Sequence, residues 1–157
     1  MEESLKSATS FPETDPTPIF ELFRGSHATE ILVAAVCHLK VFDRMADGPQ
    51  SWIELKEHTG LAERPMVVLM TALQAMGLLE KDDSGNYSST PIAREHLGAG
   101  AGFGVDGYLG LAAESPGVLD FVARLRTNKP RGAEDPETGA AFIFKEGMDS
   151  AMDREAE

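Results

Sequence analysis

The residue types in this sequence that could do chemistry are few and scattered. His27, His38, His58 and His96 have no cysteine or carboxylate partner at the spacing of a zinc site. The single cysteine, Cys37, lies within an apolar run, which predicts an inert core thiol. No Gly-x-Ser-x-Gly nucleophile pattern occurs. From motifs alone we predict no catalytic, cofactor-binding or metal-binding residue in this chain.

One glycine pattern has the form of a dinucleotide-binding loop. Gly102, Gly104 and Gly107 satisfy Gly-x-Gly-x-x-Gly. That motif binds phosphate only when a buried strand precedes it and a helix N-terminus follows it. Here the preceding residues have the pattern of a helix end. We therefore interpret residues 98–107 as a flexible joint, or hinge.

The composition excludes several kinds of partner. A chain of 157 residues, with 42% apolar and 25% charged residues, can form one sizeable globular core. Its net charge of −12 opposes binding to nucleic acid backbones. The longest apolar run, residues 31–37, is too short for a membrane span, and no usual signal peptide opens the chain. With one cysteine there is no intrachain disulfide, which fits a reducing compartment, and we predict a cytoplasmic protein. The charge and the short apolar run predict that it binds neither nucleic acid nor membrane.

The elements that must position any site fall into three regions. Residues 1–15 are polar and unpatterned, and we predict a disordered tail. Residues 16–97 have the regular pattern of one domain. Residues 98–157 are predicted to form the hinge and a helical linker.

A long first helix is expected from about Pro18. Its later half is apolar around nearly its whole circumference, which is typical of a helix covered on all sides. A central core helix is one explanation. The other is a homodimer formed through residues 18–45. The expected interface residues are Ile31, Leu32, Ala35, Val36 and Leu39.

Shorter elements follow. Ser51 and Glu54 form a capping box for a second helix that Gly60 closes. A third helix from Pro65 carries a methionine-rich stripe, predicted to be core, of Met66, Leu69, Met70, Leu73 and Met76. Residues 78–81 and 87–89 flank a polar turn and predict a hairpin, and a short helix capped by Thr90 runs to Leu97. The fold class is therefore mainly α (α+β), a winged helix-turn-helix with a two-stranded wing and further C-terminal helices.

Winged helices often bind DNA through the third helix, but this one is poorly suited to do so. A helix that reads bases needs Arg, Lys, Asn or Gln side chains and basic flanks. Between Glu63 and Gly77 only Arg64 and Gln74 qualify. A winged-helix transcriptional regulator nevertheless remains an alternative.

The apolar helix resembles part of a known family. Residues 31–45 run into Leu39-Lys40-Val41-Phe42-Asp43. This is similar to the "Leu-Gly-(Val/Ile)-Phe-Asp" signature in the dimerisation domain of S-adenosylmethionine-dependent O-methyltransferases of the plant caffeate and bacterial small-molecule type. Lys40 replaces the usual glycine. Residues 87–97 resemble the "Tyr-x-x-Thr-x-x-(Ala/Ser)-x-x-Leu" that closes the family's wing, and residues 144–148 resemble its "Phe-x-x-(Gly/Ala)-Met" helix.

The resemblance implies a two-domain enzyme. In that family a second, Rossmann-like domain carries an "Asp-Val-Gly-Gly-Gly-x-Gly" cofactor loop and a histidine base, and neither occurs here. We therefore expect this chain to be the dimerising and substrate-roofing half, ending before the catalytic domain. S-adenosylmethionine would bind the full-length enzyme and not this chain alone. The acceptor would be a small aromatic or polyketide-like hydroxyl compound. A stand-alone dimerisation module without catalysis is a further alternative.

The resemblance also suggests a lining for the acceptor pocket. The helix expected at about 141–155 places apolar residues three and four apart, so that they can share one face. Packing of this face on the chain's own core is the alternative. The expected lining residues are Phe121, Phe144, Met148, Ala151 and Met152.

Overall fold

The computed structural model describes residues 10–25 and 28–129. The predicted lining residues Phe144, Met148, Ala151 and Met152 lie outside this part of the chain. In the described part the fold is mainly helical with one two-stranded antiparallel sheet, as predicted. No helix in these ranges is both long and apolar enough to cross a membrane.

The first region is a series of short helices, so the prediction of one long helix was wrong. The pieces are α1 (Thr17–Arg24), α2 (Thr29–Val33), the π-helix η1 (Ala34–His38) and α3 (Val41–Met45). Gly25 ends α1 in an extended conformation, with φ −70° and ψ 127°. Lys40 separates η1 from α3 in a left-handed conformation, with φ 52°. Two backbone breaks therefore divide the stretch that the sequence predicted to be one helix.

The helix-turn-helix and wing match the prediction closely. Helices α4 (Trp52–Thr59) and α5 (Glu63–Ala75) lead into strands β1 (Leu79–Lys81) and β2 (Tyr87–Ser89). The Ser51–Glu54 capping box is present, and Gly60 ends α4 with φ 67°. The strands pair with Glu80 opposite Ser88.

The remaining helices are α6 (Pro91–His96), α7 (Asp106–Leu109), the 3-10 helix η2 (Gly110–Ala112) and α8 (Pro116–Thr127). Thr90 occupies the N-cap position of α6, as predicted, but its side chain makes no cap hydrogen bond. Its hydroxyl donates instead to the carbonyl of Gly77, over 2.8 Å, and so ties α6 to the end of α5.

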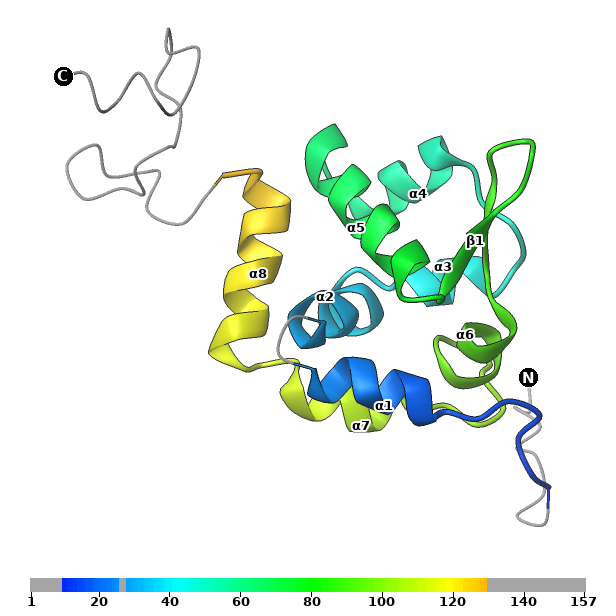
Figure 1. Ribbon diagram of the computed structural model, residues 1–157. Coiled ribbons are helices and arrows are strands. Elements are labelled where there is room, and N and C mark those ends of the chain that lie inside the picture. Colours follow the sequence, from blue (N-terminus) through cyan, green and yellow to red (C-terminus); the bar gives the residue numbers. More distant parts are fainter. Residues whose placement is uncertain (1–9, 26–27, 130–157) are drawn as a thin grey trace, which may run out of the picture.

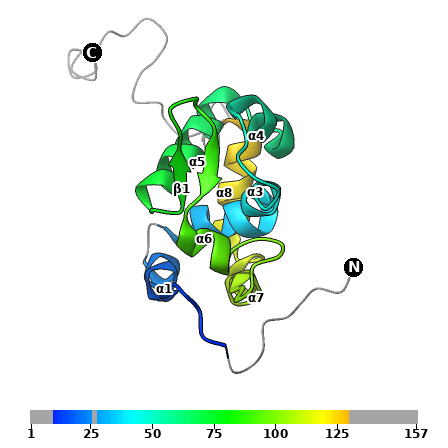
Figure 2. The ribbon, with the colours of Figure 1, turned by 90° about the vertical axis from the view of Figure 1, so that its right-hand side faces the viewer.

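The apolar segment α2–η1 occupies the middle of the fold (Figures 1 and 2). Helix α8 packs along one side of it, α5 and α1 pack against α2, and α3 and α7 contact η1. From Leu32 to Ala35 the side chains have no exposed surface at all. The chain therefore covers its own central helix.

The N-terminal segment is fixed where it approaches α6, so the predicted disordered tail is too long at its C-terminal end. The backbone N–H groups of Glu13 and Thr14 each donate to the Glu95 carboxylate over 2.7 Å. The buried ring of His96 contacts the carbonyl oxygens of Phe103, 2.9 Å from Nδ1, and Thr14, 3.1 Å from Nε2.

The glycine-rich segment after α6 is a hydrogen-bonded loop. Gly98 N–H donates to the Asp106 carboxylate over 2.9 Å, and Ala99 N–H donates to Asp43. A side chain at Gly98 would place its Cβ 2.7 Å from the carbonyl carbon of Phe42, and φ there is +84°. Glycine is thus required at 98 for close approach to α3. That the segment also acts as a hinge stays a prediction.

We predict that Gly98→Ala lowers the free energy of unfolding by about 2–5 kcal/mol. The left-handed backbone contributes about 1–2 kcal/mol and the clash with a neighbouring backbone about 1–3 kcal/mol. Gly100→Ala is the control, because φ is +83° but nothing lies within 4 Å of the added Cβ. Urea unfolding measures both. Equal losses in the two variants would show that contact with Phe42 is unimportant.

A second prediction concerns Glu95. Hydrogen bonds to its carboxylate lower the pKa of Glu95 from 4.5 to about 2. The largest effect comes from the Thr14 hydroxyl, and the next largest from the backbone N–H of Glu13. Because the folded-state pKa is depressed, these contacts stabilise the protein above pH 4.5 and lose that effect as pH falls towards 2. The carboxyl carbon of Glu95 should therefore titrate near 2 by NMR. Thr14→Ala should move the midpoint towards 4.5, whereas Thr127→Ala, on distant α8, should not. An unmoved midpoint in Thr14→Ala would contradict the assignment.

Candidate functional site

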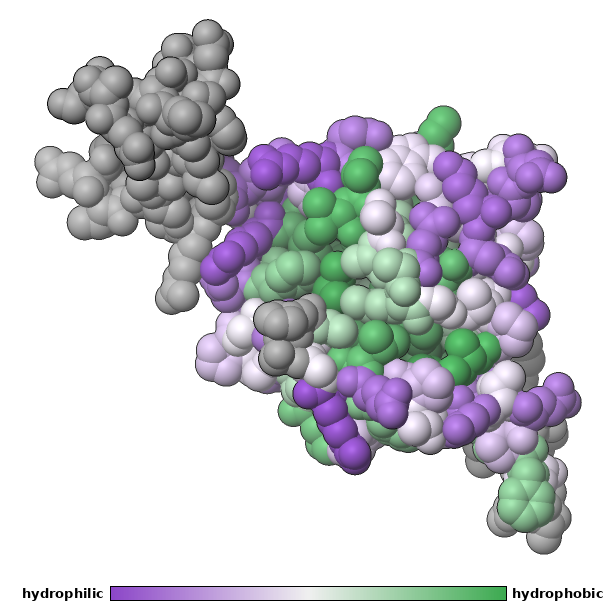
Figure 3. Space-filling model, viewed as in Figure 1, coloured by the Kyte–Doolittle hydropathy of each residue, from purple (hydrophilic) through white to green (hydrophobic). Residues whose placement is uncertain are grey.

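An open groove lies between α2, α5 and α8, with a volume of about 450 Å³. Apolar residues gather on this face between α5 and α8 (Figure 3). The groove is what remains uncovered after the chain has buried its central segment. Its apolar lining residues are Ile31, Val68, Ala72, Met76 and Phe121.

Helix α5 supplies one wall through a regular spacing. Val68, Ala72 and Met76 lie four residues apart and therefore follow one face of the helix. This stripe is out of phase with the fully buried stripe that includes Met66 and Leu73. We predicted Met76 as core, but it is only half-buried and lines the groove.

Helix α8 supplies the opposite wall. It buries Val118, Val122 and Leu125 against the rest of the fold. Phe121 is half-buried on the groove side, and Gly117 lies near the start of the helix. A Cβ at Gly117 would lie 3.2 Å from a carboxylate oxygen of Glu30, so glycine lets Glu30 approach α8.

The charged groups lie at the rim of the groove. Glu30, Asp120 and Arg124 contribute to its lining. Asp120 and Arg124 form an ion pair one turn apart on α8, with both side chains more than a third exposed. Such an exposed pair contributes little to stability, so Arg124 is available to other carboxylates.

The arrangement favours packing over catalysis. No group of three or more potential metal ligands occurs among the described residues. Cys37 lies in η1, where burial raises the pKa of its thiol and makes it a poor nucleophile. The groove offers an apolar surface with a polar rim, which is typical of a protein contact.

The structure corrects the premise of the predicted dimer interface. That prediction assumed that the apolar helix would be exposed in a single chain. Its five residues are at most 7% exposed, because α5, α8 and α1 cover them. Of the five, only Ile31 reaches the groove, which the predicted lining residue Phe121 also lines.

Sequence analysis missed the groove residues Val68 and Ala72. The available signal was their spacing with Met76, which differs in phase from the core stripe. That signal identifies an apolar edge of α5, but it does not identify α8 as the facing wall.

Comparison with known proteins places this geometry in context. The family model for the O-methyltransferase dimerisation domain matches residues 20–99. The chain is 33% identical over 135 residues to a 3-hydroxy-5-methyl-1-naphthoate 3-O-methyltransferase from Streptomyces sahachiroi, covering 84% of this chain and 38% of that protein. It is 30% identical over 139 residues to the tetracenomycin polyketide synthesis 8-O-methyl transferase TcmO from Streptomyces glaucescens, covering 82% and 41%.

A solved structure is also similar. It is the crystal structure of an O-methyltransferase family 2 protein from Planctomyces limnophilus in complex with apigenin, with 47% identity and a TM-score of 0.63. The match covers 83% of this chain and 39% of that one. The chain thus spans about two fifths of the length of the curated relatives described above. The matched segment contains the helix-turn-helix, the wing and the apolar central helix, and the chain belongs to the O-methyltransferase dimerisation domain family.

Proposed function

We propose that this chain is the dimerising half of an S-adenosylmethionine-dependent O-methyltransferase that acts on a small aromatic or polyketide-like hydroxyl acceptor. Membership of the family supports the dimerising role. The acceptor class is supported by relatives named for a naphthoate and for tetracenomycin polyketide synthesis, and by the structure that contains apigenin. The activity would belong to the whole enzyme.

The observation that carries the pairing is the apolar groove between α5 and α8. Val68 is 48% exposed on one wall, and Phe121 faces it from the other. Contact with a second copy would remove this surface from water. Burial of apolar surface stabilises a contact by about 25 cal/mol for each Å². In a twofold dimer the same patch is used by both copies. Arg124 of one copy could then approach Glu30 of the other.

This proposal changes the role that we assign to Phe121. By facing the groove it belongs to the pairing surface. The lining of the acceptor pocket stays, by resemblance, with Phe144, Met148, Ala151 and Met152.

A DNA-binding regulator is the second candidate, and the charges disfavour it. Arg64 is the only cation in α5, and the turn of the wing carries Asp82 and Asp83. A chain with net charge −12 that presents these groups would repel a phosphate backbone.

If the groove pairs two copies, this chain should be a homodimer at micromolar concentration. Light scattering should then give a mass of twice 16.9 kDa. Val68→Glu should raise the dimer dissociation constant at least about 10-fold, because it would place a charged carboxylate in an apolar contact that already has Glu30 and Asp120 at its rim. Val67→Glu is a closely matched control. Val67 is 47% exposed on the same helix, but it faces away from the groove. A monomeric unmutated chain, or equal effects of the two variants, would refute this interface.

The cofactor assignment predicts no binding of S-adenosylmethionine by the 157-residue chain alone. The candidate glycine loop follows helix α6 and is held by Asp43 and Asp106, so it lacks the strand–loop–helix arrangement of a cofactor site. Isothermal titration calorimetry with S-adenosylmethionine should give only heats of dilution. A one-site isotherm would show that the cofactor-binding residues lie in this chain.

A further inference from the structure

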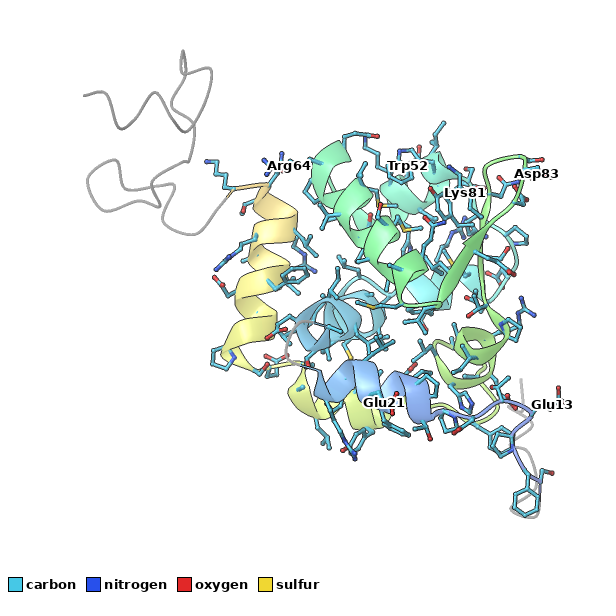
Figure 4. All side chains as sticks on the ribbon, in the orientation of Figure 1. Glu13, Glu21, Trp52, Arg64, Lys81 and Asp83 are labelled. Atoms are coloured by element: carbon cyan, nitrogen blue, oxygen red, sulfur yellow. The ribbon has the colours of Figure 1, made fainter. Side chains whose placement is uncertain are left out.

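A second cleft lies on the other side of α5 from the groove, between α4, α5 and the wing. Its volume is about 290 Å³, near the lower end of the range for small-molecule sites. Trp52 and Lys81, labelled in Figure 4, come from α4 and β1. The lining residues are Trp52, Val67, Met70, Thr71, Lys81 and Tyr87.

Backbone pairing holds the aromatic wall of this cleft in place. Gln50 N–H donates to the Tyr87 carbonyl over 2.9 Å, and Tyr87 N–H donates to the Gln50 carbonyl over 2.8 Å. This bridge places Trp52, two residues further on, beside Tyr87. The two ring centroids are 6.1 Å apart, with an angle of 42° between the ring planes. The wall is therefore formed before any ligand binds.

Lys81 places a positive charge at this wall. Its position on β1 is directly opposite Tyr87 on β2. Its ammonium lies 5.1 Å from the centre of the Tyr87 ring. No ion pair to Lys81 occurs within the described ranges, whereas Lys40 and Lys56 are paired with Asp43 and Glu63.

Asp82 and Asp83 follow Lys81 in the turn of the wing, but neither forms an ion pair with it in the described part of the chain. Asp82 accepts hydrogen bonds from the backbone and side-chain N–H groups of Asn86, and so is used within the turn of the wing. Lys81 thus places a positive charge, held over the Tyr87 ring and without an ion pair in the described ranges, beside the apolar lining of the cleft. It favours an anion that also has an apolar body.

We propose that this cleft binds a small planar aromatic carboxylate of one or two rings. The ring would pack against Trp52 and the Val67–Met70 side of α5, and the carboxylate would accept hydrogen bonds from Lys81 and the Thr71 hydroxyl. Charge-assisted hydrogen bonds of this type are stronger than neutral ones. The cleft lies on a different side of α5 from the pairing groove, so ligand binding and pairing can be tested separately.

The chain contains its own reporter, since Trp52 is the only tryptophan. Its indole N–H should give one side-chain signal in a ¹H–¹⁵N NMR spectrum. Titration of the 157-residue chain with 2-naphthoate should move this signal and reach saturation. The neutral 2-naphthamide has nearly the same shape and should bind at least about 10-fold more weakly, a loss of about 1.4 kcal/mol.

Lys81→Gln tests the role of the charge. It should weaken 2-naphthoate binding about 10-fold and remove the preference over the amide. Lys56→Gln removes a lysine on α4 that does not line the cleft, and should leave the affinity unchanged. Lys81 is exposed, so its replacement should keep the fold, and unchanged dispersion of the backbone amide signals would check this.

Four results would overturn the proposal. They are an indole signal that does not move, a shift that grows without saturation, equal affinity for acid and amide, and equal effects of the two lysine variants. The pairing proposal is tested separately by light scattering, so either proposal can fail alone.

Discussion

The structure depends on the burial of one apolar segment, α2–η1, inside a single chain. Side chains from 31 to 36 are at most 7% exposed. Full burial of such side chains contributes about 1.5–3 kcal/mol each as an upper estimate. To cover a helix on all sides, the chain must place α1, α5, α7 and α8 around it. The apolar surface left over, at the edge between α5 and α8, is therefore a consequence of how the core is closed.

The same burial explains the irregular backbone beside it. In η1 the Leu39 N–H reaches back five residues to the Ala34 carbonyl, over 2.9 Å. Lys40 then turns left-handed, and its carbonyl lies 3.0 Å from Nε2 of His58. This turn lets α3 start in a new direction and bury Phe42. A left-handed lysine costs about 1–2 kcal/mol, so the packing of α3 must offset it. The family signature that this sequence resembles has glycine at this position, which accepts such a turn without that cost.

Features determined by local chemistry could be predicted from the sequence. The capping box at Ser51 and the wing hairpin depend on residues within a few positions of each other, and both were confirmed. Features determined by contacts between distant residues could not. Nothing in the spacing of residues 18–45 indicates a break at Lys40. The contact between Thr14 and Glu95 joins residues 81 positions apart. The groove likewise exists only because α8 lies opposite α5. The spacing of apolar residues along α5 predicts which face of that helix is apolar, but it does not predict which element faces it.

Helix α5 shows how one scaffold can be adapted to different contacts. In a DNA-binding winged helix this element would present basic and amide side chains. Here the outward residues include Val67, Val68 and Thr71. Val67 and Val68 are adjacent and equally exposed, yet they face different hollows, because successive residues of a helix differ by about 100°. The buried stripe between these two edges holds α5 rigidly against the core. A rigid helix with two apolar edges can thus serve a protein contact on one side and a small-molecule contact on the other, without either one disturbing the core.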